Sequence, residues 1–296
     1  MTCGRDVRMR SARKSTRVRC SRSQGFTLLQ IALSPRTLLL YGSRFRNGAN
    51  VTQTSGHFLP FDLTTACQHL AESDAALNPL IEEARPFEMD GDPLQSPYEA
   101  LLEAIAYQSI SGKAAATIYG RVKALSGTDR PPTPEQMLKL KTRALRKAGL
   151  SGAKVLAMKD LARKTLDGVV PTLEEARALS DEELVERLVS VRGIGAWTVE
   201  MFLIFRLGRP DVLPIHDLGV KKGWSVTYGK KHMPKPKELL AFGERWRPYR
   251  TVASWYMWRA FERAGAKITN KIKPHKTRQK IKAAKHRKVA TRRKDS

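Results

Sequence analysis

The feature that most constrains the fold of this chain is a glycine-rich break, Val191-Arg-Gly-Ile-Gly195, between two helical stretches. A Ser-x-x-Glu capping box at Ser180–Glu183 opens the first stretch, where apolar residues then recur at helical spacing. The second stretch, Ala196–Leu207, carries bulky aromatic residues. Glycines two positions apart let the backbone turn sharply and be approached closely, because neither has a Cβ. The pattern predicts a helical hairpin over residues 181–207.

A single carboxylate follows this hairpin. Gly208-Arg-Pro210 ends the second helix, and Pro214-Ile-His-Asp217 delivers Asp217 to the start of another helix, 22 residues after Gly195. An aspartate in this position is often only a helix N-cap. The upstream hairpin moves our interpretation of Asp217 from a cap towards a catalytic carboxylate. The hairpin amides at Gly193 and Gly195 in turn predict a phosphate contact, because helix N-termini bind anions.

The hairpin, its tryptophan Trp197 and the downstream Pro-x-x-Asp resemble the helix-hairpin-helix DNA glycosylases, most closely the DNA-3-methyladenine glycosylase II branch. The resemblance extends from about Pro97 to Arg263. It implies an all-α, two-lobed fold that binds double-stranded DNA across the cleft between the lobes. It also implies that Asp217 is the catalytic aspartate of an enzyme that excises alkylated bases, mainly purines, at the start of base excision repair.

The residue two positions after the hairpin separates two chemistries in this family. Members that also cleave the DNA strand have a lysine there, whose amine attacks the sugar. This chain has Trp197, which cannot act as a nucleophile. The resemblance therefore implies a monofunctional glycosylase without AP lyase activity. Asp217 would stabilise an oxocarbenium-like sugar and orient or deprotonate the attacking water.

Three aromatic residues are candidates for the pocket of the extruded base: Tyr107, Trp197 and Trp258. A base such as 3-methyladenine is positively charged and binds aromatic faces through cation–π attraction. Trp258 matches an aromatic position in the final helix of relatives. Core packing is the alternative for each ring. Met201 replaces a pocket tyrosine of a relative, which implies a changed pocket shape.

The turn Tyr107-Gln-Ser-Ile-Ser111 matches the family segment that fills the hole left by the extruded base. Gln108 matches the family glutamine, whereas Ser109 occupies a position that is apolar in some relatives. Gln108 and Ile110 are both candidates for the inserting residue, and a polar turn between two helices is the alternative. The other predicted DNA contacts are Arg192, Gly193, Gly195 and Lys221. Solvated surface charge is the competing interpretation of Lys221.

Charge is concentrated in the two ends of the chain. Of the formal net charge of +26, residues 1–50 carry +10 and residues 267–296 carry +12, which leaves +4 for the remainder. We divide the chain into an extension at 1–55, a glycosylase domain at 56–266 and a disordered basic tail at 267–296. The extension is Arg- and Ser-rich and acid-poor, which fits an organellar transit peptide, a disordered segment or translation from an upstream start.

Cofactors and partners are constrained by what the sequence contains. The three cysteines, Cys3, Cys20 and Cys67, are too few and too scattered for a four-cysteine metal site, so we expect none of the iron–sulfur clusters found in several relatives. We expect no organic cofactor and no catalytic metal; the resemblance implies a monovalent cation at the hairpin. We expect a monomer that binds double-stranded DNA without a membrane, within the cytoplasm and nucleoid or a nucleus, unless the extension targets an organelle.

Two alternatives to this function stay open. The hairpin and the basic ends would equally serve a non-catalytic DNA-binding protein. The same chemistry could act on deaminated or oxidised purines, and the sequence does not separate these substrates from alkylated bases.

Overall fold

The computed structural model describes residues 59–83 and 95–271, and this part of the chain contains helices and no strand. The all-α prediction is therefore confirmed for this part. The predictions for the extension, and for the tail beyond Lys271, lie outside the described residues. Helix α14 continues to Lys271, five residues past the position where we placed the end of the domain.

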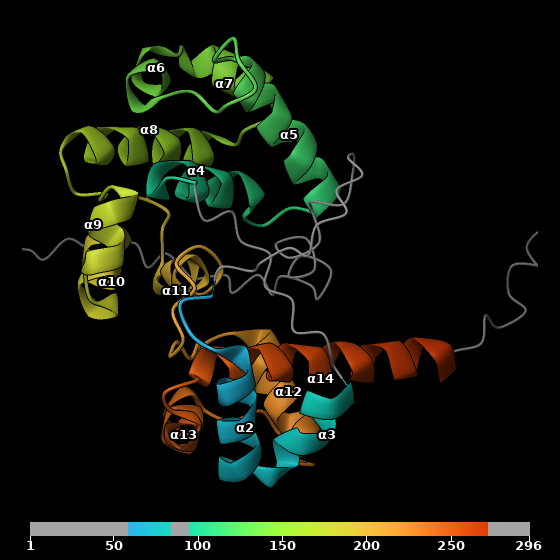
Figure 1. The fold of residues 1–296 in the computed structure, drawn as a ribbon. Coiled ribbons are helices and arrows are strands. Elements are labelled where there is room, and N and C mark those ends of the chain that lie inside the picture. Colours follow the sequence, from blue (N-terminus) through green and yellow to red (C-terminus); the bar gives the residue numbers. More distant parts are fainter. Residues whose placement is uncertain (1–58, 84–94, 272–296) are drawn as a thin grey trace, which may run out of the picture. The chain divides into compact units, whose positions relative to one another are not determined.

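The helices are labelled as in Figure 1. They are α2 (Leu63–Ser73), α3 (Asn78–Glu83), α4 (Pro97–Tyr107), α5 (Gly112–Ala124), α6 (Pro134–Lys139), α7 (Thr142–Lys147), α8 (Gly152–Leu166), α9 (Leu173–Ala178), α10 (Asp181–Val189), α11 (Ala196–Phe205), α12 (Leu218–Thr227), α13 (Pro236–Phe242) and α14 (Arg250–Lys271), with the 3₁₀ turns η1 (Ala75–Leu77) and η2 (Gly243–Trp246).

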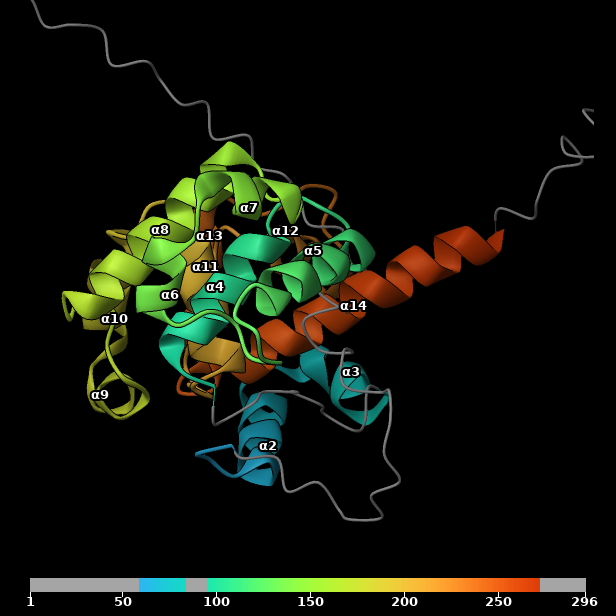
Figure 2. The ribbon, with the colours of Figure 1, turned by 90° about the horizontal axis from the view of Figure 1, so that it is seen from above.

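The helices pack in two groups, which correspond to the two predicted lobes. In the first group α8 packs against α4, α6 and α7, and α5 packs against α4; both views show these helices together in shades of green (Figures 1 and 2). In the second group α14 packs along α12 and also contacts α2 and α3. Helix α11 contacts α4 and α10, and its Phe205 stacks on Trp258 of α14. Helix α11 thus touches both groups.

The sequence predicts helix starts at capping boxes that begin with Ser96, Thr133 and Ser180, and at a cap residue, Ser111. Ser96, Thr133 and Ser180 each accept a bond from the backbone N–H three residues later, and each is part of a complete capping box. Ser111 is the N-cap residue of α5 but makes no side-chain cap bond. The predicted start of α5 is therefore correct, whereas the cap bond expected there is missing.

Basic side chains cover the carboxyl ends of several helices. Lys154 Nζ donates to the carbonyl of Ala106 in the last turn of α4, at 2.8 Å. An Arg209 amino group donates to the carbonyl of Leu179 after α9, at 2.6 Å. A cation at a helix C-terminus typically contributes about 0.3–1 kcal/mol. Part of the modest positive charge of the central region therefore stabilises the fold itself.

Asp74 joins three segments of the second group. This buried carboxylate caps η1, and its Oδ2 accepts bonds from the Tyr228 hydroxyl at 2.5 Å and from Trp246 Nε1 at 2.9 Å. Tyr228 follows α12 and Trp246 ends η2. The contact anchors the N-terminal helices on the same helix that begins at Asp217.

Candidate active site

Asp217 is the N-cap of α12, as one of its two interpretations predicts. Its Oδ1 accepts a bond from the Val220 N–H at 2.8 Å. Because Asp217 is at the N-terminus of α12, its carboxylate lies at the positive end of the helix dipole. Capping leaves Oδ2 and a second lone pair of Oδ1 for other partners, so the cap and a further role are compatible.

Two indole groups fill those remaining positions. Trp197 Nε1 donates to Asp217 Oδ2 at 2.9 Å, and Trp258 Nε1 donates to Asp217 Oδ1 at 2.8 Å. The two tryptophans are 20 and 41 residues from the aspartate in sequence. Asp217 is only 5% exposed. Three N–H groups therefore hold one carboxylate in a fixed orientation through charge-assisted hydrogen bonds.

The two indoles have different surroundings. Trp258 is 2% exposed and stacks on Phe205, with ring centres 5.6 Å apart and ring planes at 22°. A Cβ on Gly219 would lie 2.7 Å from Trp258 Cδ1, so only glycine leaves room for this ring beside α12. Trp197, in the first turn of α11, is only partly buried. Its position leaves more of the ring available to a ligand than that of Trp258.

The glycine hairpin between α10 and α11 has the predicted form. Gly193 has φ +79°, a left-handed conformation that favours glycine, and a Cβ there would lie 3.2 Å from Ala157 Cβ of α8. The Arg192 N–H donates to Asp160 Oδ2 at 2.7 Å, which ties the hairpin to α8. Arg192, Gly193 and Gly195 are exposed at the start of α11. Their role as DNA contacts stays a prediction, as does a cation at the hairpin.

The turn at residues 107–111, predicted to fill the hole left by an extruded base, contacts this hairpin. Gln108 Nε2 donates to the carbonyl of Gly193 at 2.9 Å. Ser109 follows with φ +60° and is exposed, while Ile110 is partly buried. The structure thus brings two separately predicted DNA-binding segments together. Either Gln108 or Ile110 remains a candidate for insertion into DNA.

The other two predicted site residues, Tyr107 and Lys221, lie on α4 and α12. Tyr107 is buried and meets Tyr119 of α5 edge to face, with ring centres 6.3 Å apart. Lys221 lies in the first turn of α12, where its N–H donates to the Asp217 carbonyl, and its side chain is partly exposed. A base-pocket role for Tyr107 and a phosphate contact for Lys221 both stay predictions.

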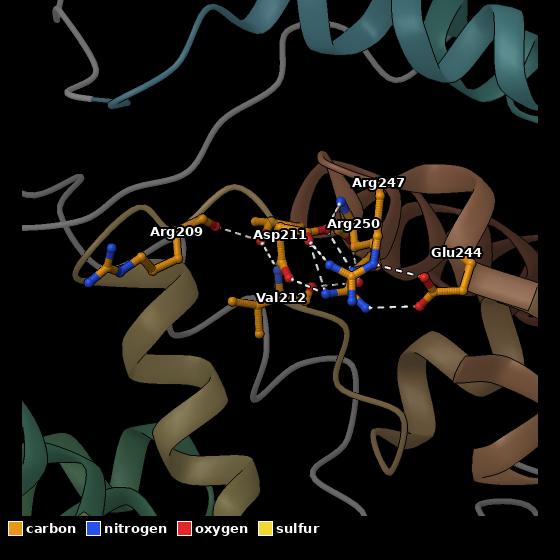
Figure 3. Close-up of polar contacts among 8 residues, drawn as sticks. Arg209, Asp211, Val212, Glu244, Arg247 and Arg250 are labelled. Carbon is orange, nitrogen blue, oxygen red and sulfur yellow. Dashed lines mark hydrogen bonds and ion pairs between the residues drawn. The ribbon is translucent and has the colours of Figure 1, made fainter. Parts of the chain in front are cut away.

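Asp211 secures the segment that leads to Asp217 (Figure 3). Its carboxylate accepts bonds from Arg250 Nε at 2.6 Å and from Arg247 Nη1 at 2.7 Å. Glu244 pairs with both arginines, and Figure 3 shows the two arginines between Asp211 and Glu244. The network fastens residues 209–212 to the start of α14. It therefore positions the segment before Asp217 relative to the helix that carries Trp258.

Thr251 adds a buried link in the same place, and its loss is expected to weaken the fold. Its Oγ1 donates to the Arg209 carbonyl at 2.6 Å and accepts from the Val212 N–H at 3.0 Å. Thr251→Val keeps the shape but leaves both backbone groups unpaired, so we expect a loss of about 2–4 kcal/mol in the free energy of unfolding, measured with urea. Thr117→Val, at an exposed site on α5, should change it by less than about 0.5 kcal/mol. Equal effects of the two changes would contradict this role.

Comparison with known proteins identifies the family. The model for HhH-GPD superfamily base excision DNA repair proteins matches residues 102–248. The DNA-3-methyladenine glycosylase 1 of Schizosaccharomyces pombe is 40% identical over 182 residues, which cover 62% of this chain and 79% of that protein. This chain belongs to the HhH-GPD superfamily.

Solved structures confirm that the HhH-GPD fold extends over most of the described residues. The Schizosaccharomyces pombe 3-methyladenine DNA glycosylase Mag1 in complex with abasic DNA matches with a TM-score of 0.59 and 38% identity, covering 66% of this chain and 95% of that one. The Bacillus halodurans DNA-3-methyladenine glycosidase matches with a TM-score of 0.60 and 34% identity, covering 66% and 88%. The predicted helix-hairpin-helix glycosylase fold is therefore correct.

A second acid near Asp217, Glu200 of α11, was not predicted from the sequence. Glu200 is the only charged residue in α11, whose other residues are mostly apolar. Burial, followed by the nearby charge of Asp217, raises the pKa of Glu200 from 4.5 to about 7. The signal in the sequence was a lone acid in an apolar helical run, three residues after Trp197.

The raised pKa of Glu200 gives a stability that depends on pH. Because the folded protein holds this proton more tightly than the unfolded chain, the contribution is complete below pH 4.5 and is lost as pH rises through about 7. Glu200→Gln removes the titration. The free energy of unfolding of Glu200→Gln, minus that of the unmodified protein, is therefore expected to rise by on the order of 2 kcal/mol between about pH 5 and pH 8. Urea unfolding at the two pH values measures this difference. A difference that is the same at both pH values would show that the pKa of Glu200 is not raised.

The described residues show neither a metal-binding cluster nor a membrane-spanning helix. Within residues 59–83 and 95–265, no group of three or more His, Cys, Asp or Glu side chains is placed to hold a metal ion. Among the helices described, none has the length and apolar character needed to span a bilayer.

Proposed function

We propose that this HhH-GPD protein is a monofunctional DNA glycosylase that hydrolyses the N-glycosidic bond of alkylated bases, of the 3-methyladenine type, in double-stranded DNA. The observation that carries the proposal is the Asp217 carboxylate, held by Trp197 and Trp258 at the helix that follows the hairpin. The names of the similar proteins, DNA-3-methyladenine glycosylase and glycosidase, support the same reaction and the same substrate class.

Asp217 has the chemistry that this hydrolysis needs. Cleavage of the N-glycosidic bond places positive charge on the sugar, which a fixed carboxylate stabilises electrostatically. The same carboxylate orients the attacking water and accepts its proton. A methylated purine is already cationic and leaves as a neutral base, so no strong general acid is required. The partly exposed indole of Trp197 offers an aromatic face to such a cation.

Trp197 also argues for a glycosylase without lyase activity, of the DNA-3-methyladenine glycosylase II type. Its indole Nε1 is bonded to Asp217 at the hairpin position where the family's lyases carry an amine. With no lysine nucleophile at this position, water attacks the sugar, and the product is an abasic site in an intact strand. The reaction needs no organic cofactor, catalytic metal or iron–sulfur cluster.

We propose that the protein binds DNA as a monomer, without a membrane. The exposed hairpin amides at Gly193 and Gly195 hold a phosphate, and Gln108 or Ile110 fills the space of the extruded base. The related Mag1 was solved with abasic DNA, which supports binding of a DNA duplex containing the product site. Arg192 and Lys221 add phosphate contacts.

The test is release of free base from methylated duplex DNA. We expect 3-methyladenine in the supernatant and an abasic site in the DNA, with strand breaks only after alkali. Strand breaks before alkali would contradict the monofunctional mechanism. Base release from deaminated or oxidised duplexes, without release from methylated DNA, would replace the substrate class. DNA binding with no release from any of these substrates would favour a non-catalytic binding protein.

A further inference from the structure

Glu200 lies one helical turn from Trp197, whose indole N–H donates to the Asp217 carboxylate. It follows Trp197 by three residues on α11, and residues at this spacing share a face of a helix. Trp197 donates to Asp217 Oδ2, and the Asp217 charge is close enough to raise the pKa of Glu200. The proposed mechanism uses Asp217 and both indoles but assigns no role to Glu200.

One oxygen of the Glu200 carboxyl group, Oε2, is buried without a hydrogen-bond partner among the described residues. A buried carboxylate without a partner is costly, so the protonated form of Glu200 predominates below about pH 7. Near neutral pH, both protonation states are therefore populated.

Other charged groups near Glu200 share a cavity of about 680 Å³ that it helps to line. Helix α10 contributes Asp181, Glu182 and Glu186. The segment before Asp217 and the start of α14 contribute Arg209, Asp211, Arg247 and Arg250. Outside this cavity, helix α4 also packs on α11 and carries Glu103, which pairs with Arg206.

The cations among these groups already have partners. Arg209 pairs with Asp181, while Arg247 and Arg250 pair with Asp211. None of them forms an ion pair with Glu200 among the residues that the structure describes. The cavity gives solvent protons a route to the Glu200 carboxyl group, so its ionisation can follow the pH of the solution.

We propose that Glu200 is a positioning residue that acts through Asp217. Its ionisation adds a negative charge near the Asp217 carboxylate and the Trp197 indole. The two states of Glu200 differ by one full charge in a poorly solvated region, where charge interactions are strong. When Glu200 ionises, the second negative charge strengthens the field at the cationic sugar. It also makes the Asp217 oxygen a stronger acceptor for the Trp197 indole N–H.

The first experiment observes this coupling without any enzymatic turnover. In ¹⁵N-labelled protein, the indole N–H resonance of Trp197 is assigned by its loss in Trp197→Phe and followed with pH. We expect it to move downfield through a single step near pH 7, set by the pKa of about 7 for Glu200. The step should be absent in Glu200→Gln. Glu186→Gln, which removes an exposed acid from the same cavity, should keep it.

The second experiment rests on the proposed function and measures single-turnover base release. We expect the rate constant to rise about fivefold between about pH 6 and pH 8 in the unmodified protein and in Glu186→Gln. Glu200→Gln should have a flat profile at the low-pH value, because it mimics the protonated acid.

The outcomes separate the inference from the proposed function. An indole step that persists in Glu200→Gln would overturn the inference. So would a rate in Glu200→Gln that is reduced by the same factor at every pH, because that would be a structural defect. An indole step that depends on Glu200, in a protein that releases no base, would leave the inference standing and remove the proposed function.

Discussion

Asp217→Asn is expected to lower the single-turnover rate of base release by about three orders of magnitude, with helical content unchanged. The substitution removes the negative charge that would stabilise the cationic sugar, and also the base that would accept a proton from water. Removal of one strong electrostatic contact to a transition state commonly costs two to three orders of magnitude, and here one group supplies both effects.

The hydrogen bonds of Asp217 add a measurable effect on stability. Asparagine has one oxygen where aspartate has two, so its amide group must face an N–H of either Trp197 or Trp258. Two donors then oppose each other at a buried site, and we expect a loss of about 1–3 kcal/mol in the free energy of unfolding.

Asp129→Asn is the matched control for this substitution. It makes the same chemical change at an exposed loop position and should alter neither rate nor stability. Rates should be compared at a temperature where circular dichroism shows every variant folded. Full activity of Asp217→Asn under those conditions would mean that another group carries the reaction.

Gly223→Ala is expected to reduce the free energy of unfolding by at least about 3 kcal/mol. A Cβ on Gly223 of α12 would lie 1.8 Å from the carbonyl oxygen of Met257 and 2.8 Å from its Cα, so it collides with the backbone of α14. No rotamer change relieves a collision with backbone, and the two helices must separate or tilt. Met257 precedes Trp258, so the separation would also withdraw an indole from Asp217.

Gly120→Ala is the control for this collision. Gly120 lies within α5, is exposed, and has no atom within 4 Å of the position of a Cβ. The same substitution should therefore stabilise the protein by about 0.5–1 kcal/mol, because alanine has the higher helix propensity. Urea unfolding of both variants tests the pair. A Gly223→Ala protein as stable as Gly120→Ala would show that α12 and α14 are not in contact in solution.

The local structure followed from sequence because its causes are local. The capping boxes at Ser96, Thr133 and Ser180 predicted where helices begin, since a cap needs only residues three positions apart. The glycine hairpin and the start of α12 at Asp217 were predictable for the same reason. The failure at Ser111 shows the boundary of such signals, because a suitable residue type does not guarantee that its side chain makes the bond.

The resemblance to a known family extended the prediction from elements to chemistry. It predicted Asp217 as the catalytic carboxylate, and Trp197 in place of an amine nucleophile predicted a glycosylase without lyase activity. Neither conclusion depends on tertiary contacts, because each rests on the type of residue at a motif position. The sequence alone therefore determined the helical hairpin, the candidate acid and the class of reaction.

Only the tertiary structure decided how these residues act together. Trp197 and Trp258 were predicted as surfaces for a base. In the structure their indole N–H groups also donate hydrogen bonds to Asp217, from 20 and 41 residues away in the sequence. In the sequence, Glu200 is one acid in an apolar helix. In the folded protein its Oε2 atom is buried without a hydrogen-bond partner, and its pKa rises to about 7. Hydrogen-bond partners and burial depend on which helices pack together, and the spacing of residues in the sequence does not predict that packing.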